Sequence, residues 1–67
     1  MKSETLKYID KIIKLDTLSD SQILQLEKEL NIHLQTLSEK EQTEFAESGY
    51  GEALYMVCSG IRYENNK

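Results

Sequence analysis

The sequence of 67 residues has no proline, three glycines and one cysteine. Without proline and with little glycine, a β architecture built on hairpins is disfavoured, because tight turns depend on these residues. The one cysteine, Cys58, cannot form an internal disulfide, whereas small secreted domains usually need several. We therefore expect a helical protein of a reducing, cytoplasmic compartment.

Long hydrophobic runs are also missing. The longest spans six residues, from Ala53 to Cys58, which is far below the roughly 20 residues of a membrane-spanning helix. Near the N-terminus, charged residues such as Lys7 and Asp10 interrupt the apolar ones, unlike in a secretory signal. The sequence therefore predicts neither a membrane-spanning helix nor a secretory signal. Its length indicates a single helical domain over residues 1–67.

Hydrophobic periodicity predicts an all-α fold, a small bundle of three to four short helices. The first helix is expected over about 3–15, with an apolar side that includes Leu6, Ile9, Ile12 and Ile13. A long central helix is expected over about 20–37, after a capping box formed by Ser19 and Gln22. Its apolar residues form a narrow stripe: Ile23, Leu26, Leu30, Leu34 and Leu37.

A second capping box, Ser38 with Glu41, predicts a third helix over about 39–48 that reaches the core mainly through Phe45. The glycines at 49 and 51 indicate either a turn or a kink in one continuous helix. A fourth helix is expected over about 51–59, with Gly60 as its C-terminal cap and a frayed tail over 62–67. Its expected buried residues are Ala53, Leu54, Val57 and Cys58.

Two apolar residues of the long helix do not fit its stripe. At 100° per residue, Leu24 lies about 100° from the stripe and Ile32 lies nearly opposite it. Either this helix is buried on more than one side, or Leu24 and Ile32 contact another chain. They are the candidate residues for self-association into a homodimer.

The sequence offers no catalytic or metal-binding pattern. Cys58 and His33 both fall on apolar faces, and a thiol buried in apolar surroundings has a raised pKa and is inert. One cysteine and one histidine without a ligand pair at the usual spacing do not make a zinc site, and the acidic turn over 16–20 lacks the ligands of a calcium loop. We expect no enzymatic activity, no metal and no cofactor.

The charge is unevenly distributed. Residues 1–14 carry four lysines against two acids, a net charge of +2, whereas residues 15–67 carry four basic residues against ten acids, a net charge of −6. Direct binding to nucleic acid is therefore not expected. Five carboxylates cluster within 14 residues and form either a solvated surface or an acidic face for a basic partner: Glu39, Glu41, Glu44, Glu47 and Glu52.

Next to these acids, an apolar group points away from the buried side of the fourth helix. Tyr55, Met56 and Tyr63 lie there with Arg62, and such residues either pack within the bundle or anchor a partner. The sequence favours a non-catalytic protein-binding regulator or inhibitor. The alternative is a nucleic-acid mimic of a phage or plasmid, a mobile element, that inhibits a DNA- or RNA-processing or defence enzyme, such as a restriction or CRISPR nuclease. A third hypothesis is a structural homodimer.

Overall fold

The computed structural model describes residues 2–65, and within them the chain forms four α-helices and one short 3₁₀ turn. The α-helices are α1 (Ser3–Ile13), α2 (Asp20–Gln35), α3 (Glu39–Ser48) and α4 (Tyr50–Asn65), and the 3₁₀ turn η1 (Leu15–Thr17) follows α1. The predicted all-α fold class is confirmed.

Both predicted capping boxes are present, and they fix the starts of α2 and α3. The amide of Gln22 donates to Ser19 Oγ at 3.2 Å, and the amide of Ser19 donates to Gln22 Oε1 at 2.9 Å. Ser38 and Glu41 make the same reciprocal pair at the start of α3, at 3.2 and 3.4 Å. Each pair satisfies two backbone donors that a helix start would otherwise leave free.

The first two helices end two residues earlier than predicted. The hydroxyl of Thr17 donates to the carbonyl of Lys14 at 2.7 Å, and the hydroxyl of Thr36 donates to the carbonyl of His33 at 2.6 Å. These local bonds offer the last carbonyls an alternative to a further α-helical turn. Leu37 remains buried even though it lies beyond the end of α2.

One glycine separates α3 from α4, so the kinked continuous helix is not formed. Gly49 has a φ of 81° and caps α3 in the left-handed conformation, which costs glycine little. The helix α4 then begins at Tyr50, one residue before its expected start, and Gly51 lies inside its first turn. The turn therefore consists of Gly49 alone.

The predicted end of the fourth helix was wrong. Instead of stopping at 59 with Gly60 as a cap, α4 continues through this glycine to Asn65. Ile61 is buried and Arg62 pairs with Glu27 of α2, so tertiary contacts hold the turn that follows the glycine. The tail expected to fray is helical over 62–65, and the part of that prediction concerning 66–67 lies outside the described residues.

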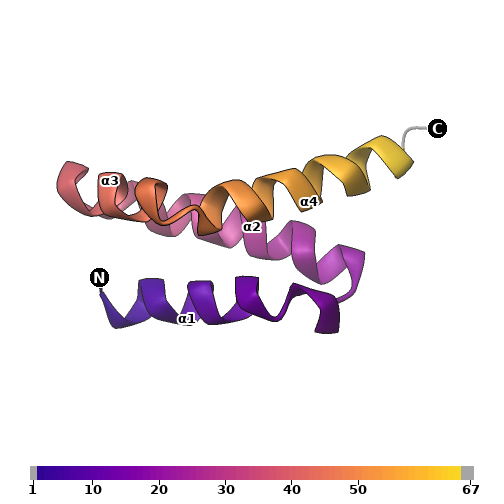
Figure 1. The fold of residues 1–67 in the computed structure, drawn as a ribbon, viewed down its shortest axis with the longest axis horizontal. Coiled ribbons are helices and arrows are strands. Elements are labelled where there is room, and N and C mark those ends of the chain that lie inside the picture. The colour runs from indigo at the N-terminus through magenta and orange to yellow at the C-terminus, as the bar shows by residue number, and fades with distance from the viewer. Residues whose placement is uncertain (1, 66–67) are drawn as a thin grey trace.

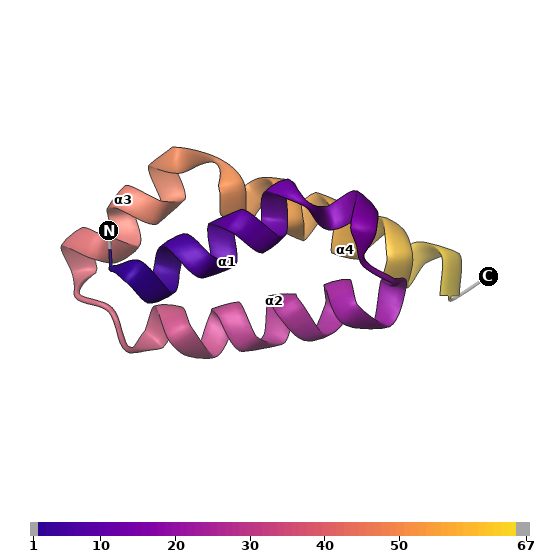
Figure 2. The same ribbon diagram turned by 90° about the horizontal axis from the view of Figure 1, so that it is seen from below.

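The helices α1, α2 and α4 run along the length of the bundle, and α3 lies at the end where α1 begins (Figures 1 and 2). The two chain ends lie at opposite ends of the long axis (Figure 1), which measures 38 Å. The long α2 has 16 residues, but α4 has the same length and packs against each of the other three α-helices. Side chains of α4 therefore lie both in its contact with α2 and in its contact with α3.

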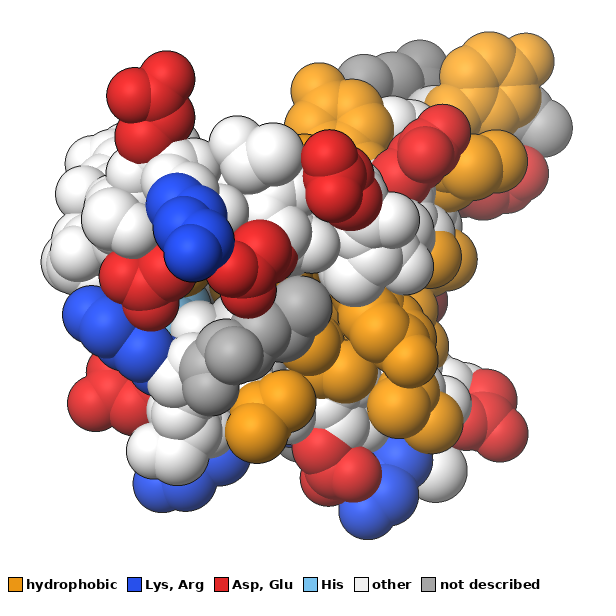
Figure 3. Space-filling model, turned by 60° about the vertical axis from the view of Figure 1, so that its left-hand side comes forward, with side chains coloured by type: hydrophobic (Ala, Val, Ile, Leu, Met, Phe, Trp, Pro, Cys, Tyr) orange, Lys and Arg blue, Asp and Glu red, His pale blue; other side chains and the backbone are white. Residues whose placement is uncertain are grey.

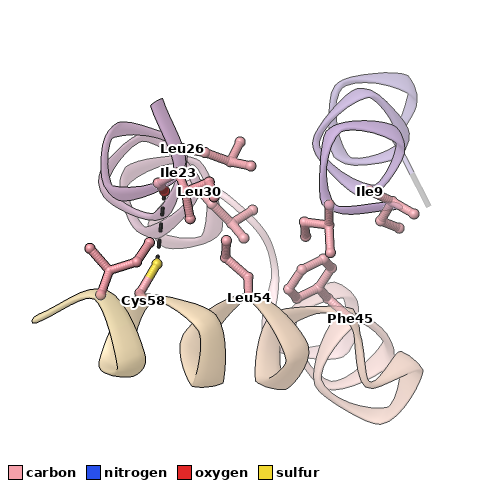
Figure 4. Packing of buried hydrophobic residues seen from close by; sticks show 9 residues of the cluster. Ile9, Ile23, Leu26, Leu30, Phe45, Leu54 and Cys58 are labelled. Carbon is pink, nitrogen blue, oxygen red and sulfur yellow. Dashed lines mark hydrogen bonds between the residues drawn. The ribbon is translucent and has the colours of Figure 1, made fainter. Parts of the chain in front are cut away.

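The core lies where α4 meets the other helices. Leu54 points from α4 toward Leu30 of α2 and Phe45 of α3, and Ile9 points in from α1 (Figure 4). The expected burial of Leu30 and of Phe45 is confirmed, as is that of Leu54 and Cys58. The expected burial of Ala53 and Val57 was wrong, because both are exposed. Of the residues expected on the apolar side of the first helix, Ile9 and Ile12 are buried, whereas Leu6 and Ile13 are exposed.

Candidate docking groove

A groove lies between α2, α3 and α4, with a volume of about 360 Å³. Its hydrophobic lining residues come from all three helices: Leu30, Leu34, Phe45 and Leu54. The remaining lining residues are Glu27, Asn31, Ala46, Gly51, Glu52 and Tyr55. Two of the predicted partner-binding residues, Glu52 and Tyr55, therefore meet at one groove.

Gly51 shapes the groove where α3 turns into α4. A Cβ atom at this position would lie 2.7 Å from Cε1 of Phe45, closer than real Cβ contacts. The absence of a side chain lets the Phe45 ring pack directly against the first turn of α4. This contact places the ring among the residues that line the groove.

The three apolar residues that the sequence indicates as an anchor for a partner, Tyr55, Met56 and Tyr63, do not all line the groove. Tyr55 is 61% exposed and lines the groove. Met56 and Tyr63 are also exposed, but neither is among the groove-lining residues, because they lie about 100° and 80° around α4 from Tyr55. Tyr55 is thus the member of this group that combines exposure with a neighbouring hollow.

The glutamates of α3 do not share one face. Glu41 is half-buried and accepts from Ser38, and these hydrogen bonds hold the pKa of its carboxyl below the usual value. Glu39, Glu44 and Glu47 are exposed. However, Glu39 lies about 140° around the helix from Glu44, so the five predicted acids do not form a continuous surface.

On the face drawn in Figure 3, acidic side chains lie at several separate places, and Lys or Arg side chains lie among some of them. On α3, Lys40 shares a side with Glu44 and Glu47 at the spacing i, i+4 and i+7. A lysine there lowers the local negative charge.

The two candidate residues for self-association also lie apart. Leu24 is half-buried and packs against the core, whereas Ile32 is 60% exposed. Eight positions along α2 place them about 80° apart around the helix. The structure does not bring them together as one apolar patch.

One ion pair was not expected from the sequence. The guanidinium of Arg62 on α4 binds Oε1 of Glu27 on α2, although Arg62 had been expected to point outward with Tyr55 and Tyr63. Glu27 is 9% exposed, and its Oε2 is buried without a hydrogen-bond partner. The burial of Glu27 could have been predicted from the sequence, since Glu27 lies within about 40° of Ile23 on the helical wheel and so falls inside the apolar stripe.

His33 belongs to a second polar cluster. Its Nε2 lies 2.8 Å from Thr5 Oγ1, and its Nδ1 lies 3.6 Å from Glu4 Oε2. The order carboxylate, imidazole and hydroxyl occurs in hydrolases, but Thr5 is only 2% exposed, so its hydroxyl is enclosed in the bundle. The cluster joins α1 to α2 and presents no reachable nucleophile.

Cys58 lies elsewhere, in the contact between α4 and α2. Its thiol is fully buried, and its Sγ lies 3.8 Å from the carbonyl oxygen of Ile23 (Figure 4). Burial, followed by the nearby Glu27 carboxylate, raises the pKa of the thiol to about 11. His33 contacts α1 instead, so the structure does not pair this cysteine with the histidine.

Metal ligation and membrane insertion have no candidate sites among residues 2–65. No group of three or more His, Cys, Asp or Glu side chains in this range is placed to hold a metal ion. Within the same range, no helix has the length and hydrophobicity needed to cross a bilayer. Comparisons with protein-family models, curated proteins and solved structures found no match to this chain.

Proposed function

We propose that this protein is a non-catalytic binding module that regulates or inhibits a protein target, and that the target docks over the groove between α2, α3 and α4. Tyr55 carries the proposal, because its exposed side chain stands beside an apolar hollow. Exposed tyrosines next to pockets often contribute much of the energy of an interface once a partner removes them from water.

The carboxylate of Glu52, next to Tyr55, is also part of the proposed docking site. Glu52 lies one helical turn before Tyr55 and lines the same groove. Exposed charges mainly steer the encounter, whereas desolvated aromatic side chains slow dissociation. Met56 and Tyr63 would contribute to the outer part of the same contact, because they extend the exposed apolar surface of α4.

The nucleic-acid mimic receives less support from the carboxylates. A mimic requires exposed acids in a regular row, but Glu41 is bonded to Ser38 and Glu39 faces away from Glu44. A basic nucleic-acid-binding enzyme nevertheless remains a suitable target for a protein of net charge −4. The mimic and the structural homodimer are therefore outcomes that the following experiment can distinguish.

The test compares Tyr55→Ala with a matched variant, Ile32→Ala. Ile32 has nearly the same exposed fraction but is not among the groove residues. The target is captured from extract of the native cells and identified, and its binding to the purified variants is then measured. We expect Tyr55→Ala to weaken binding by about 1–3 kcal/mol, mainly through faster dissociation, and Ile32→Ala to leave it unchanged.

Equal affinities of the wild type and the Tyr55 variant would refute docking at the groove. In that case, a large loss for the double variant Glu44→Lys, Glu47→Lys at low salt would favour the mimic, because exposed ion pairs are screened by salt. A wild-type dimer in sedimentation, converted to a monomer by Ile32→Glu with unchanged helicity, would instead favour the structural homodimer.

A further inference from the structure

We infer that the groove between α2, α3 and α4 binds a basic amphipathic helix, which inserts an apolar side chain beside Leu34 and Phe45 and places a Lys or Arg near Glu52. This inference rests on the proposed function and specifies the chemistry of the partner. It is carried by the charge of the groove, its shape and the polar atoms around it.

The charge of the groove is of one sign. Two of its ten lining residues are acidic, Glu27 and Glu52, and none is Lys, Arg or His. Arg62 neutralises Glu27 from outside the lining, which leaves Glu52 as the uncompensated charge beside Tyr55. A cationic side chain would complement this carboxylate, whereas an acidic one would be repelled by it.

Glu27 provides a second, independent observation. Its Oε2 is buried and has no hydrogen-bond partner, although the residue belongs to the lining of the groove. A buried carboxylate oxygen without a donor is costly, and a movement of the Glu27 side chain toward the groove would let a docked partner supply the donor. Guanidinium and ammonium groups supply such donors and also complement the charge of Glu52.

The shape of the groove favours a helix over an extended segment. An extended peptide usually binds by adding to the edge of a sheet, and residues 2–65 contain no strand that could offer such an edge. The groove is bordered by three helices, and the small, exposed Ala46 lines it on α3. A further helix can therefore approach the groove there, with apolar residues at a spacing of i, i+3, i+4 and i+7.

The experiment uses two designed peptides that share the same leucine stripe. One carries Lys and Arg on its polar face, and the other carries Glu at the same positions. Binding to the full chain is measured by fluorescence anisotropy, and the site is mapped from amide shifts in ¹⁵N NMR spectra. We expect the cationic peptide to bind at least about tenfold more tightly than the acidic one, with shifts centred on residues 27–34, 45–46 and 51–55.

Charge reversal at the exposed Glu52 tests whether this carboxylate selects the cationic peptide. Glu52→Lys should reduce or invert the preference between the peptides, while Glu64→Lys, with the same change outside the groove, should retain it. Glu27→Gln, checked for native helicity, should weaken the cationic peptide without affecting an uncharged analogue. The inference is overturned if both peptides bind equally, if the shifts lie on α1, if neither peptide binds, or if Glu52→Lys retains the wild-type preference.

These failures differ from a failure of the proposed function. If neither peptide binds but Tyr55→Ala still weakens the natural target, the docking site stands and the partner chemistry is wrong. If Tyr55→Ala leaves the natural target unaffected, the docking site itself is wrong, whatever the peptides do.

Discussion

The helices α1 and α4 both pack against α2, but by different chemistry. Between α1 and α2, the enclosed hydroxyl of Thr5 meets His33, and the ring of Tyr8 lies 5.1 Å from the imidazole, centroid to centroid. Between α4 and α2, the buried side chains are mainly apolar, with one ion pair, Glu27 to Arg62, at the margin. Hydrogen bonds require a defined distance and angle, whereas apolar burial is not directional.

This difference assigns different tasks to the two contacts. The polar cluster fixes the position of α1 along α2, because Thr5 and His33 match only in one register. We expect the apolar contact to supply most of the stability, because α4 contributes Leu54, Cys58 and Ile61 to the buried core and buried apolar surface is the main stabilising contribution. Two substitutions and one pH profile test this difference between the two contacts.

The largest effect is expected for Leu54→Ala. This side chain is enclosed among α2, α3 and α4, and its truncation should lower the free energy of unfolding by about 2–5 kcal/mol. The measurement is urea denaturation followed by circular dichroism. Val57→Ala on the same helix is the control, since Val57 is 39% exposed and should lose less. A loss below about 1 kcal/mol for Leu54→Ala would show that the apolar contact is not the main source of stability.

A smaller effect is expected for Thr5→Val, which keeps the shape of the side chain and removes its hydroxyl. His33 Nε2 would then be buried without its partner, at a cost of about 1–3 kcal/mol. Hydrogen exchange should show α1 opening more readily than α4. The exposed Thr43→Val is the control and should stay within about 0.5 kcal/mol. If Thr5→Val left the free energy of unfolding unchanged, burial and not the hydrogen bond would hold α1 in place.

The smallest effect concerns alkaline pH at the contact between α4 and α2. Because the pKa of Cys58 is raised to about 11 in the folded protein, the neutral thiol stabilises the fold below the pKa of the unfolded chain. That stabilisation is lost as the pH rises from the unfolded value through 11. Thiol labelling at pH 8 should therefore follow unfolding, and Cys58→Ala should flatten the alkaline stability profile. Rapid labelling of the native protein would show that α4 opens locally.

Much of the local structure could be predicted from the sequence, because it depends on neighbours along the chain. Ser19 with Gln22 and Ser38 with Glu41 set two helix starts through bonds that span three residues. The stripe through Leu30 likewise follows from helical geometry alone. The ends of α1 and α2 were predicted less well, since threonine hydroxyls compete there for the last carbonyls.

The candidate site was predicted only in part. Helical spacing places Glu52 and Tyr55 one turn apart on the fourth helix, but the groove that both line also needs α2 and α3, whose placement no local pattern gives. Glu41 was assigned to a binding face although its own capping box engages it. Helical spacing places Glu27 inside the apolar stripe, but its pairing with Arg62 spans 35 residues, so spacing could not identify the partner.

Local sequence patterns account for the all-α class, both capping boxes and the burial of Leu30, Leu54 and Phe45. These features follow from hydrogen bonds and periodicity within single helices. The continuation of α4 through Gly60 depends on packing between helices, because Ile61 gains burial and Arg62 gains a partner across the bundle. The same packing leaves Leu6 and Val57 exposed and encloses Thr5. A helical wheel gives the direction of a side chain, but which directions are covered depends on how the helices pack.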